Sequence, residues 1–133
     1  MYTEGKYLYK MCSLSNANLT GTGTIYTWTP AKRWSVYGAV IVPTTAIGAC
    51  TTAAVIDLNH TPSGGSVTSK ITITATASTG IGTEVAGTAT STGSDVFDLA
   101  SGDTLYVAVD TAMAGGTTTG VVDVYLILNE LPA

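Results

Sequence analysis

The chain has 133 residues, a net charge of −4 at pH 7 and a charged fraction of only 11%. A chain of this length forms one domain with its own core, and its negative charge has the wrong sign for contacts with phosphate backbones. The longest apolar run, 36–42, is far shorter than the ~20 residues of a membrane helix. We therefore expect one domain that neither binds nucleic acid directly nor enters a membrane.

The first twenty residues show no sustained hydrophobic period but carry aromatic and basic side chains: Tyr2, Lys6, Tyr7, Tyr9 and Lys10. Aromatic side chains are enriched at protein interfaces because they bury a large area at small entropic cost. The segment is either an extended arm that contacts another subunit or a first edge strand packed on its own domain. We divide the chain into an N-terminal arm, 1–20, and one β-sandwich domain, 21–133. A chain that lacks 1–15 is then expected to keep its sandwich folded.

The next two segments alternate as strands do. Segment 22–28 has an aromatic face that includes Trp28, and the following Pro30 interrupts it because proline removes a backbone donor. Segment 34–42 is the most apolar and is typical of a central strand covered on both sides. Its expected end is Pro43. One face of this strand is predicted to contain Trp34, Val36, Val40 and Val42.

The rest of the chain contains a predicted hairpin, a loop and three further strands. Segments 52–58 and 70–75 form the hairpin, and the small residues of 76–94 form a loop with a possible short strand near Glu84 and Val85. Segment 95–110 is predicted as a strand, a turn at Gly102 and a second strand, and 120–128 closes the core. The predicted core residues are Ile71, Ile73, Leu105, Val107, Val109, Val122, Val124 and Leu126.

Seven or eight short strands without helical periodicity predict an all-β fold. Their spacing favours an antiparallel sandwich of two sheets, jelly-roll-like or immunoglobulin-like. The immunoglobulin alternative lacks its Cys-Trp-Cys arrangement, because Cys50 follows Trp34 and no later cysteine exists. We therefore predict the jelly-roll-like sandwich.

Catalytic chemistry is not indicated by any motif. His60 is the single histidine, and its candidate orienting residue, Asp57, does not belong to a recognisable triad. A lone histidine before Thr-Pro in a turn is typical of a loop residue. The aspartates lie near strand ends, where carboxylates usually cap turns, although a glycosidase pair has the same residue types. Cys12, Cys50 and His60 lack the spacing of a zinc site, so we expect no bound metal. Together with the missing catalytic motifs, this leads us to expect that the protein is not an enzyme and has no cofactor.

Several stretches together resemble the head-decoration (cement) proteins of tailed bacteriophages. The resemblance covers about 34–131 and is carried by 34–42, 54–66, 70–73, 99–109 and 129–131. It includes Thr61-Pro-Ser-Gly-Gly65 and Leu99-Ala-Ser-Gly-Asp-Thr-Leu105. The resemblance implies a β-sandwich that assembles as a homotrimer on the outside of the phage head and stabilises the shell. The implied partner is the major capsid protein, and the implied location is the virion surface after assembly in the host cytoplasm.

Under this interpretation, Cys12 and Cys50 are expected to be reduced, because phage particles assemble in a reducing cytosol. The residues expected to contact the capsid or a neighbouring protomer are Tyr2, Lys6, Tyr7, Tyr9, Lys10, Trp28 and Trp34. The alternative is an adhesion or carbohydrate-binding module of a phage or cell surface. Such a module would use Trp28, Trp34 and Tyr37 as platforms on which sugar rings stack.

Overall fold

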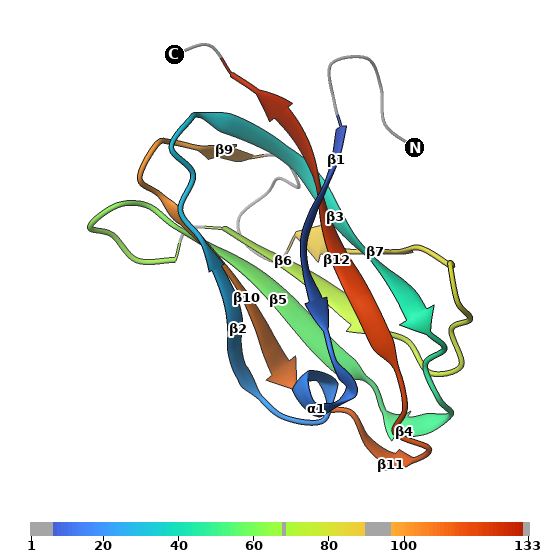
Figure 1. Cartoon of the computed structure of the whole chain (residues 1–133). Helices are drawn as coiled ribbons and strands as arrows, with labels where there is room; N and C mark the ends of the chain where they lie inside the picture. Colours follow the sequence, from blue (N-terminus) through green and yellow to red (C-terminus); the bar gives the residue numbers. More distant parts are fainter. Residues whose placement is uncertain (1–6, 68, 90–96, 132–133) are drawn as a thin grey trace.

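The expected all-β sandwich is confirmed. The structure, a computed structural model, describes residues 7–67, 69–89 and 97–131. Two five-stranded antiparallel sheets pack against each other, and a two-stranded ribbon and one short helix lie together at one end (Figure 1). The helix, α1, spans Asn16–Leu19.

Each sheet contains strands from both halves of the chain. Sheet A has the order β1 (Tyr7–Leu14), β12 (Val121–Glu130), β3 (Trp34–Thr45) and β7 (Val85–Ala86), and β9 (Phe97–Leu99) also pairs with β3. Sheet B has the order β2 (Gly23–Trp28), β10 (Thr104–Thr111), β5 (Ala54–Thr61), β6 (Ser69–Ala75) and β8 (Thr88–Ala89). The ribbon pairs β4 (Cys50–Thr52) with β11 (Ala114–Gly116).

The strand pairs are nested along the chain. The first strand, β1, pairs with the last, β12, while β2 pairs with β10, β3 with β9, and β5 with β6. A set of nested antiparallel pairs wrapped into two sheets is a jelly roll. Within the described residues, seven strands have six residues or more: β1, β2, β3, β5, β6, β10 and β12. The predicted hairpin corresponds to β5 and β6.

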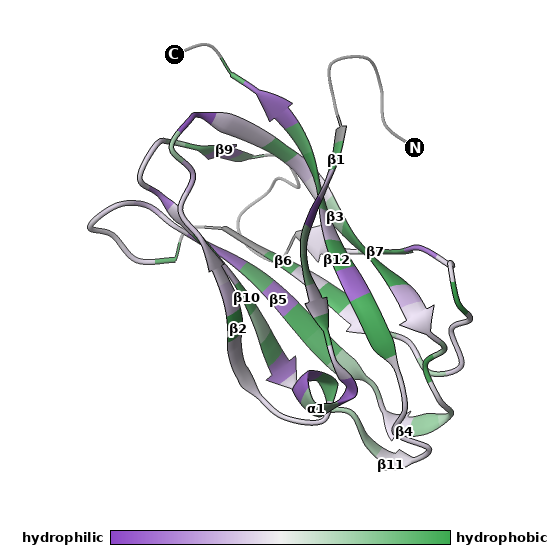
Figure 2. Cartoon of the chain, viewed as in Figure 1, coloured by the Kyte–Doolittle hydropathy of each residue, from purple (hydrophilic) through white to green (hydrophobic). Residues whose placement is uncertain are grey.

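The core between the sheets contains every residue that the sequence analysis assigned to it. All eight are at most 2% exposed: Ile71, Ile73, Leu105, Val107, Val109, Val122, Val124 and Leu126. Strong hydrophobic stretches lie on β5 and β12 (Figure 2). Because β5 belongs to sheet B and β12 to sheet A, both sheets contribute to one contiguous core.

The N-terminal segment from Tyr7 onward is not an arm separate from the sandwich. It forms the edge strand β1 and then α1, whose first turn Ser15 and Asn18 cap reciprocally. Leu14 and Leu19 are fully buried in the core. The structure therefore gives a reason to expect that a chain lacking 1–15 is destabilised, because this deletion removes the whole edge strand β1, with Leu14. Tyr2 and Lys6 lie outside the described residues.

Two predicted details of segment 34–42 are also wrong. Tyr37 is an extra residue in β3, because Gly38 pairs with Ile127 and Val36 pairs with the next residue of β12, Leu128. This β-bulge reverses the alternation of inward and outward side chains from Gly38 onward, and the φ of Gly38 is +144°. Val36 and Ala39 therefore both face the core, whereas Val40, which was predicted to share the face of Val36, points outward. Pro43 does not end the strand, which continues to Thr45.

Segment 95–110 contains the predicted turn but not a hairpin. Gly102 has a φ of +87°, as the turn requires. Its two arms separate, because β9 pairs with β3 in sheet A while β10 joins sheet B. The turn therefore carries the chain from one sheet to the other.

Gly87 is another point at which the chain passes between the sheets, within the segment predicted as a loop. It separates β7 in sheet A from β8 in sheet B, and its N–H donates to the Ala39 carbonyl at 2.9 Å. A Cβ at this position would lie 2.5 Å from Cγ2 of Ile71, closer than real side chains approach. Only glycine fits this crossing without moving the core.

Candidate functional site

Three of the predicted contact residues meet in one aromatic cluster. The rings of Tyr9 and Trp28 have centroids 5.2 Å apart, and those of Trp28 and Trp34 are 6.3 Å apart. Tyr9 lies on β1 of sheet A, opposite the buried Leu126, whereas Trp28 lies on β2 of sheet B, opposite the buried Leu105. Residues opposite one another share a face, so both rings point between the sheets. They are half-buried and pack against the core where these two edge strands approach.

Tyr26 extends this cluster. It is two residues before Trp28 and also packs against the core. Burial raises the pKa of Tyr9, and the charge and hydroxyl hydrogen bond of Tyr26 raise it further. Tyr9 therefore remains uncharged at neutral pH. The shared face of Tyr26 and Trp28 was predictable from their spacing, but their contact with Tyr9 was not, because it joins two different sheets.

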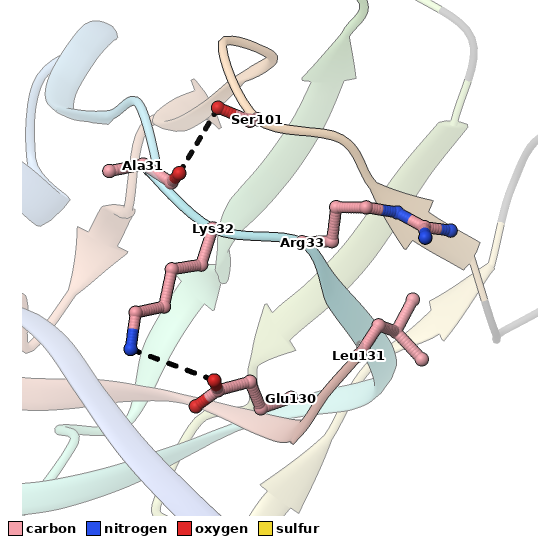
Figure 3. A pocket seen from close by; sticks show the side chains of 6 residues that line it. All are labelled: Ala31, Lys32, Arg33, Ser101, Glu130 and Leu131. Atoms are coloured by element: carbon pink, nitrogen blue, oxygen red, sulfur yellow. Dashed lines mark hydrogen bonds and ion pairs between the residues drawn. The ribbon is translucent and has the colours of Figure 1, made fainter. Parts of the chain in front are cut away.

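A pocket of about 480 Å³ lies at the end of the sandwich where β1 begins and β12 ends. We call this the upper end, after its place in Figure 1. Its lining residues, shown in Figure 3, are Ala31, Lys32, Arg33, Ser101, Glu130 and Leu131. The loop 29–33, which joins Trp28 to Trp34, supplies half of them. The pocket and the aromatic cluster thus share one loop.

Two interactions hold the walls of the pocket. Lys32 Nζ lies 3.6 Å from a carboxylate oxygen of Glu130, and Ser101 Oγ donates to the Ala31 carbonyl at 3.1 Å. Arg33 points away from the Lys32–Glu130 pair (Figure 3). The lining therefore combines one ion pair, a second cation at Arg33 and the apolar side chain of Leu131.

Of the other predicted contact residues, the structure describes Tyr7 and Lys10, which lie elsewhere on β1. Tyr7 begins the strand opposite Leu128, and Lys10 faces outward beside Tyr125. Lys10 is exposed, with Nζ 3.5 Å from Asp123, and Ser13 Oγ donates to the same carboxylate at 2.5 Å. The structure therefore does not place Lys10 in the aromatic cluster.

The interpretation of His60 as a loop residue is wrong. His60 belongs to β5, is 6% exposed, and has Nε2 2.8 Å from Oδ2 of Asp103, which is equally buried. The Phe97 ring stacks on the imidazole with centroids 5.2 Å apart. The proposed partner, Asp57, instead accepts a hydrogen bond from the Thr72 hydroxyl on the outer face of sheet B.

Asp103 is held by backbone groups as well as by His60. Its oxygens also accept the N–H groups of Ala100 at 3.0 Å and Ser63 at 3.2 Å. Burial by itself would raise the pKa of Asp103, but the hydrogen bonds from His60 and these two amides outweigh burial and lower the pKa below its ordinary value. The pair connects β5, the loop after it and the β9–β10 turn.

Both cysteines are free thiols. Burial and then the charge of Asp123 raise the pKa of Cys12 to about 11, although Lys10 opposes this effect. Among the residues that the structure describes, no group of three metal-ligating side chains could hold an ion. No helix in the same residues is long and apolar enough to span a bilayer.

No protein family, curated protein or solved structure matches the chain.

Proposed function

We propose that the protein is a structural virion protein of the head-decoration type. In this proposal it binds the outside of a phage head through its upper end, as a homotrimer, and its partner is the major capsid protein. The observation that carries the proposal is the aromatic cluster: Tyr9, Trp28 and Trp34 come from three strands and meet beside an open pocket. The resemblance across 34–131 supplies the class of partner.

The chemistry of the upper end suits attachment to a folded protein surface. Half-buried aromatic rings gain further contact area on binding and lose little conformational entropy, because the core already holds them. The pocket beside them has room for a large side chain of the shell. Lys32 and Glu130 at its rim form an ion pair, so contact with a neutral or mixed surface brings these two charges into the interface together.

The carbohydrate-binding alternative fits this geometry less well. A sugar-binding platform presents one flat aromatic face, whereas Trp28 is tilted by 31° from Tyr9 and by 47° from Trp34. Their rings also pack against the core. The third candidate platform residue, Tyr37, is the bulge residue of β3. The cluster is thus better suited to an irregular protein surface than to a flat sugar ring.

The test is co-sedimentation of the full chain with phage heads that lack a decoration protein. The blocking variant is Ala31→Arg, which places a long charged side chain in the pocket. Its matched control is Ala49→Arg, the same change at another exposed alanine, in the loop before β4 at the lower end. We expect the wild type and Ala49→Arg to sediment with the heads and Ala31→Arg to remain in the supernatant.

Two results would contradict the proposal. Equal binding by both variants would remove the upper end from the contact. No binding by the wild type, combined with retention on a glycan array, would favour the carbohydrate-binding module.

A further inference from the structure

The outer faces of the two sheets differ in chemistry. On sheet B, the residues that point away from the core are mainly hydroxyl-bearing or polar: Thr24, Thr27, Asp57, Asn59, Thr61, Thr72, Thr74, Thr104 and Tyr106. On sheet A, Tyr125 and Ile127 alternate with the buried Val124, Leu126 and Leu128, so they point outward. A face that meets only water is expected to resemble sheet B.

The strand register arranges the outer face of sheet A in rows. One row contains Leu8, Ile127 and Gly38. The next contains Lys10, Tyr125, Val40 and Ala86, and a third contains Ser13, Asp123 and Val42. We call these three rows the side face. Neighbouring strands lie about 4.8 Å apart, so the apolar side chains form one continuous surface.

Side-chain packing on the side face is already close. Val40 is only 4% exposed although it points outward, and Leu8, Val42, Tyr125 and Ile127 are half-buried. A hollow of about 190 Å³ continues this surface past Gly38, between Ile127 and Ala86. The side face therefore combines a flat apolar surface with a recess for a side chain.

The side face carries no net charge. Its charged residues are Lys10 and Asp123, which form an ion pair at 3.5 Å. Two further carboxylates lie just beyond the three rows: Glu84, which precedes β7 and follows Val42 in the register of β3 and β7, and Asp98 on β9, which accepts a hydrogen bond from Ser35 at 2.8 Å. The whole chain carries −4. Two copies of an acidic protein repel each other, so they associate most readily where one surface adds no charge.

We infer that the side face is the contact with a second copy of this chain. The argument rests on the proposed function in one respect. If the upper end faces the shell, the side face runs along the length of the molecule and is directed toward a neighbouring copy. Contact there would bury Leu8, Tyr125 and Ile127 and pass no unpaired charge into the interface.

The test is sedimentation velocity of the full chain at micromolar concentrations, without phage heads. We expect the wild type to sediment as an oligomer. Ile127→Lys should weaken association at least ~100-fold, because it places an unpaired cation in the contact. Its matched control, Val55→Lys, changes a half-buried outward aliphatic residue on sheet B and should associate as the wild type does. Far-ultraviolet circular dichroism confirms that each variant is folded.

A charge exchange tests the same contact without changing an apolar residue. Lys10→Glu gives the side face two negative charges and should dissociate the oligomer, and Lys10 is exposed enough for this variant to fold. Adding Asp123→Lys restores neutrality and should restore association.

A monomeric wild type would overturn the inference, as would an oligomer that Lys10→Glu leaves intact or a double variant that stays monomeric. All three of these outcomes are measured on the protein alone, without phage heads. An oligomer that binds no heads would contradict the proposed function alone.

Discussion

His60 and Asp103 face each other inside the sandwich, with 2.8 Å between Nε2 and Oδ2 and only 6% of each residue exposed. They are 43 positions apart in sequence. Asp103 belongs to the turn that carries the chain from sheet A to sheet B, and His60 belongs to β5 in sheet B. Through Asp103, this turn is joined to β5 and to the start of the loop that follows it.

Replacing Asp103 with asparagine should destabilise the fold. The change removes the negative charge that His60, Ala100 and Ser63 share, and hydrogen bonds to a charged group contribute about 1.5–3 kcal/mol each. We expect the free energy of unfolding in urea to fall by about 2–3 kcal/mol. Asp110→Asn on the exposed end of β10 is the control and should change it by less than about 0.5 kcal/mol. A similar effect of both variants would contradict the role of Asp103.

The stability of the protein should depend on pH through the same carboxylate. The folded-state pKa of Asp103 lies below its ordinary value of 3.8, so the unfolded chain takes up the proton first as the pH falls. The stabilisation is therefore present in full above that ordinary value and is lost as the pH falls through the folded-state pKa. Urea unfolding across the acidic range should show a flatter profile for Asp103→Asn than for the wild type. If the free energy of unfolding fell equally steeply with pH in both proteins, other carboxylates would be the cause of the loss of stability in acid.

Cys12 should react slowly while the protein is folded. Its pKa is raised to about 11 from an ordinary 9.0, and each unit lowers the reactive thiolate fraction about tenfold at mildly alkaline pH. In a Cys50→Ser background, iodoacetamide should modify Cys12 roughly 100-fold more slowly in the folded protein than in urea. Mass spectrometry measures both rates. Equal rates would show that the thiol is not desolvated.

Removing residues 1–15 should unfold the protein rather than release a passive arm. The deletion removes Met11 and Leu14 from the core, and each buried aliphatic side chain contributes about 1.5–3 kcal/mol. The free energy of unfolding should fall by at least ~3 kcal/mol. A chain that begins at Tyr7 keeps every described strand and serves as the comparison. Cooperative melting of the chain lacking 1–15 at the wild-type temperature would contradict this prediction.

Sequence periodicity predicted those strands that run without irregularity. Ile71 and Ile73 alternate along β6, which pairs with β5 without a register shift, and both lie in the core. Where a β-bulge adds a residue, the period breaks. The bulge between Lys10 and Cys12 is the reason that β1 lacked a recognisable pattern, and the Tyr37–Gly38 bulge reversed the predicted faces of β3.

The contacts between strands that are distant in sequence were the part that sequence patterns could not supply. His60 and Asp57 are three positions apart on one strand, so they point to opposite faces, and the nearby aspartate was the wrong partner. The correct partner, Asp103, is brought close only when β5 and β10 pair. The same holds for Tyr9 and Trp28, whose strands belong to different sheets. Trp28 and Trp34 were nevertheless recognised as contact candidates from their residue type.

The two long edges of the sandwich resist separation of the sheets to different degrees. Along one edge, Gly87 is a single covalent step from β7 to β8, and its hydrogen bond to Ala39 holds that step against β3. Along the other edge, β1 and β2 are connected covalently only through α1 at the lower end, while the rings of Tyr9 and Trp28 meet between the two strands without a chain crossing. A covalent crossing cannot lengthen, whereas a ring contact can open and close. We therefore expect thermal opening of the protein to begin between β1 and β2, and we expect a molecule that wedges an apolar group between Tyr9 and Trp28 to loosen the jelly roll along that edge before any other.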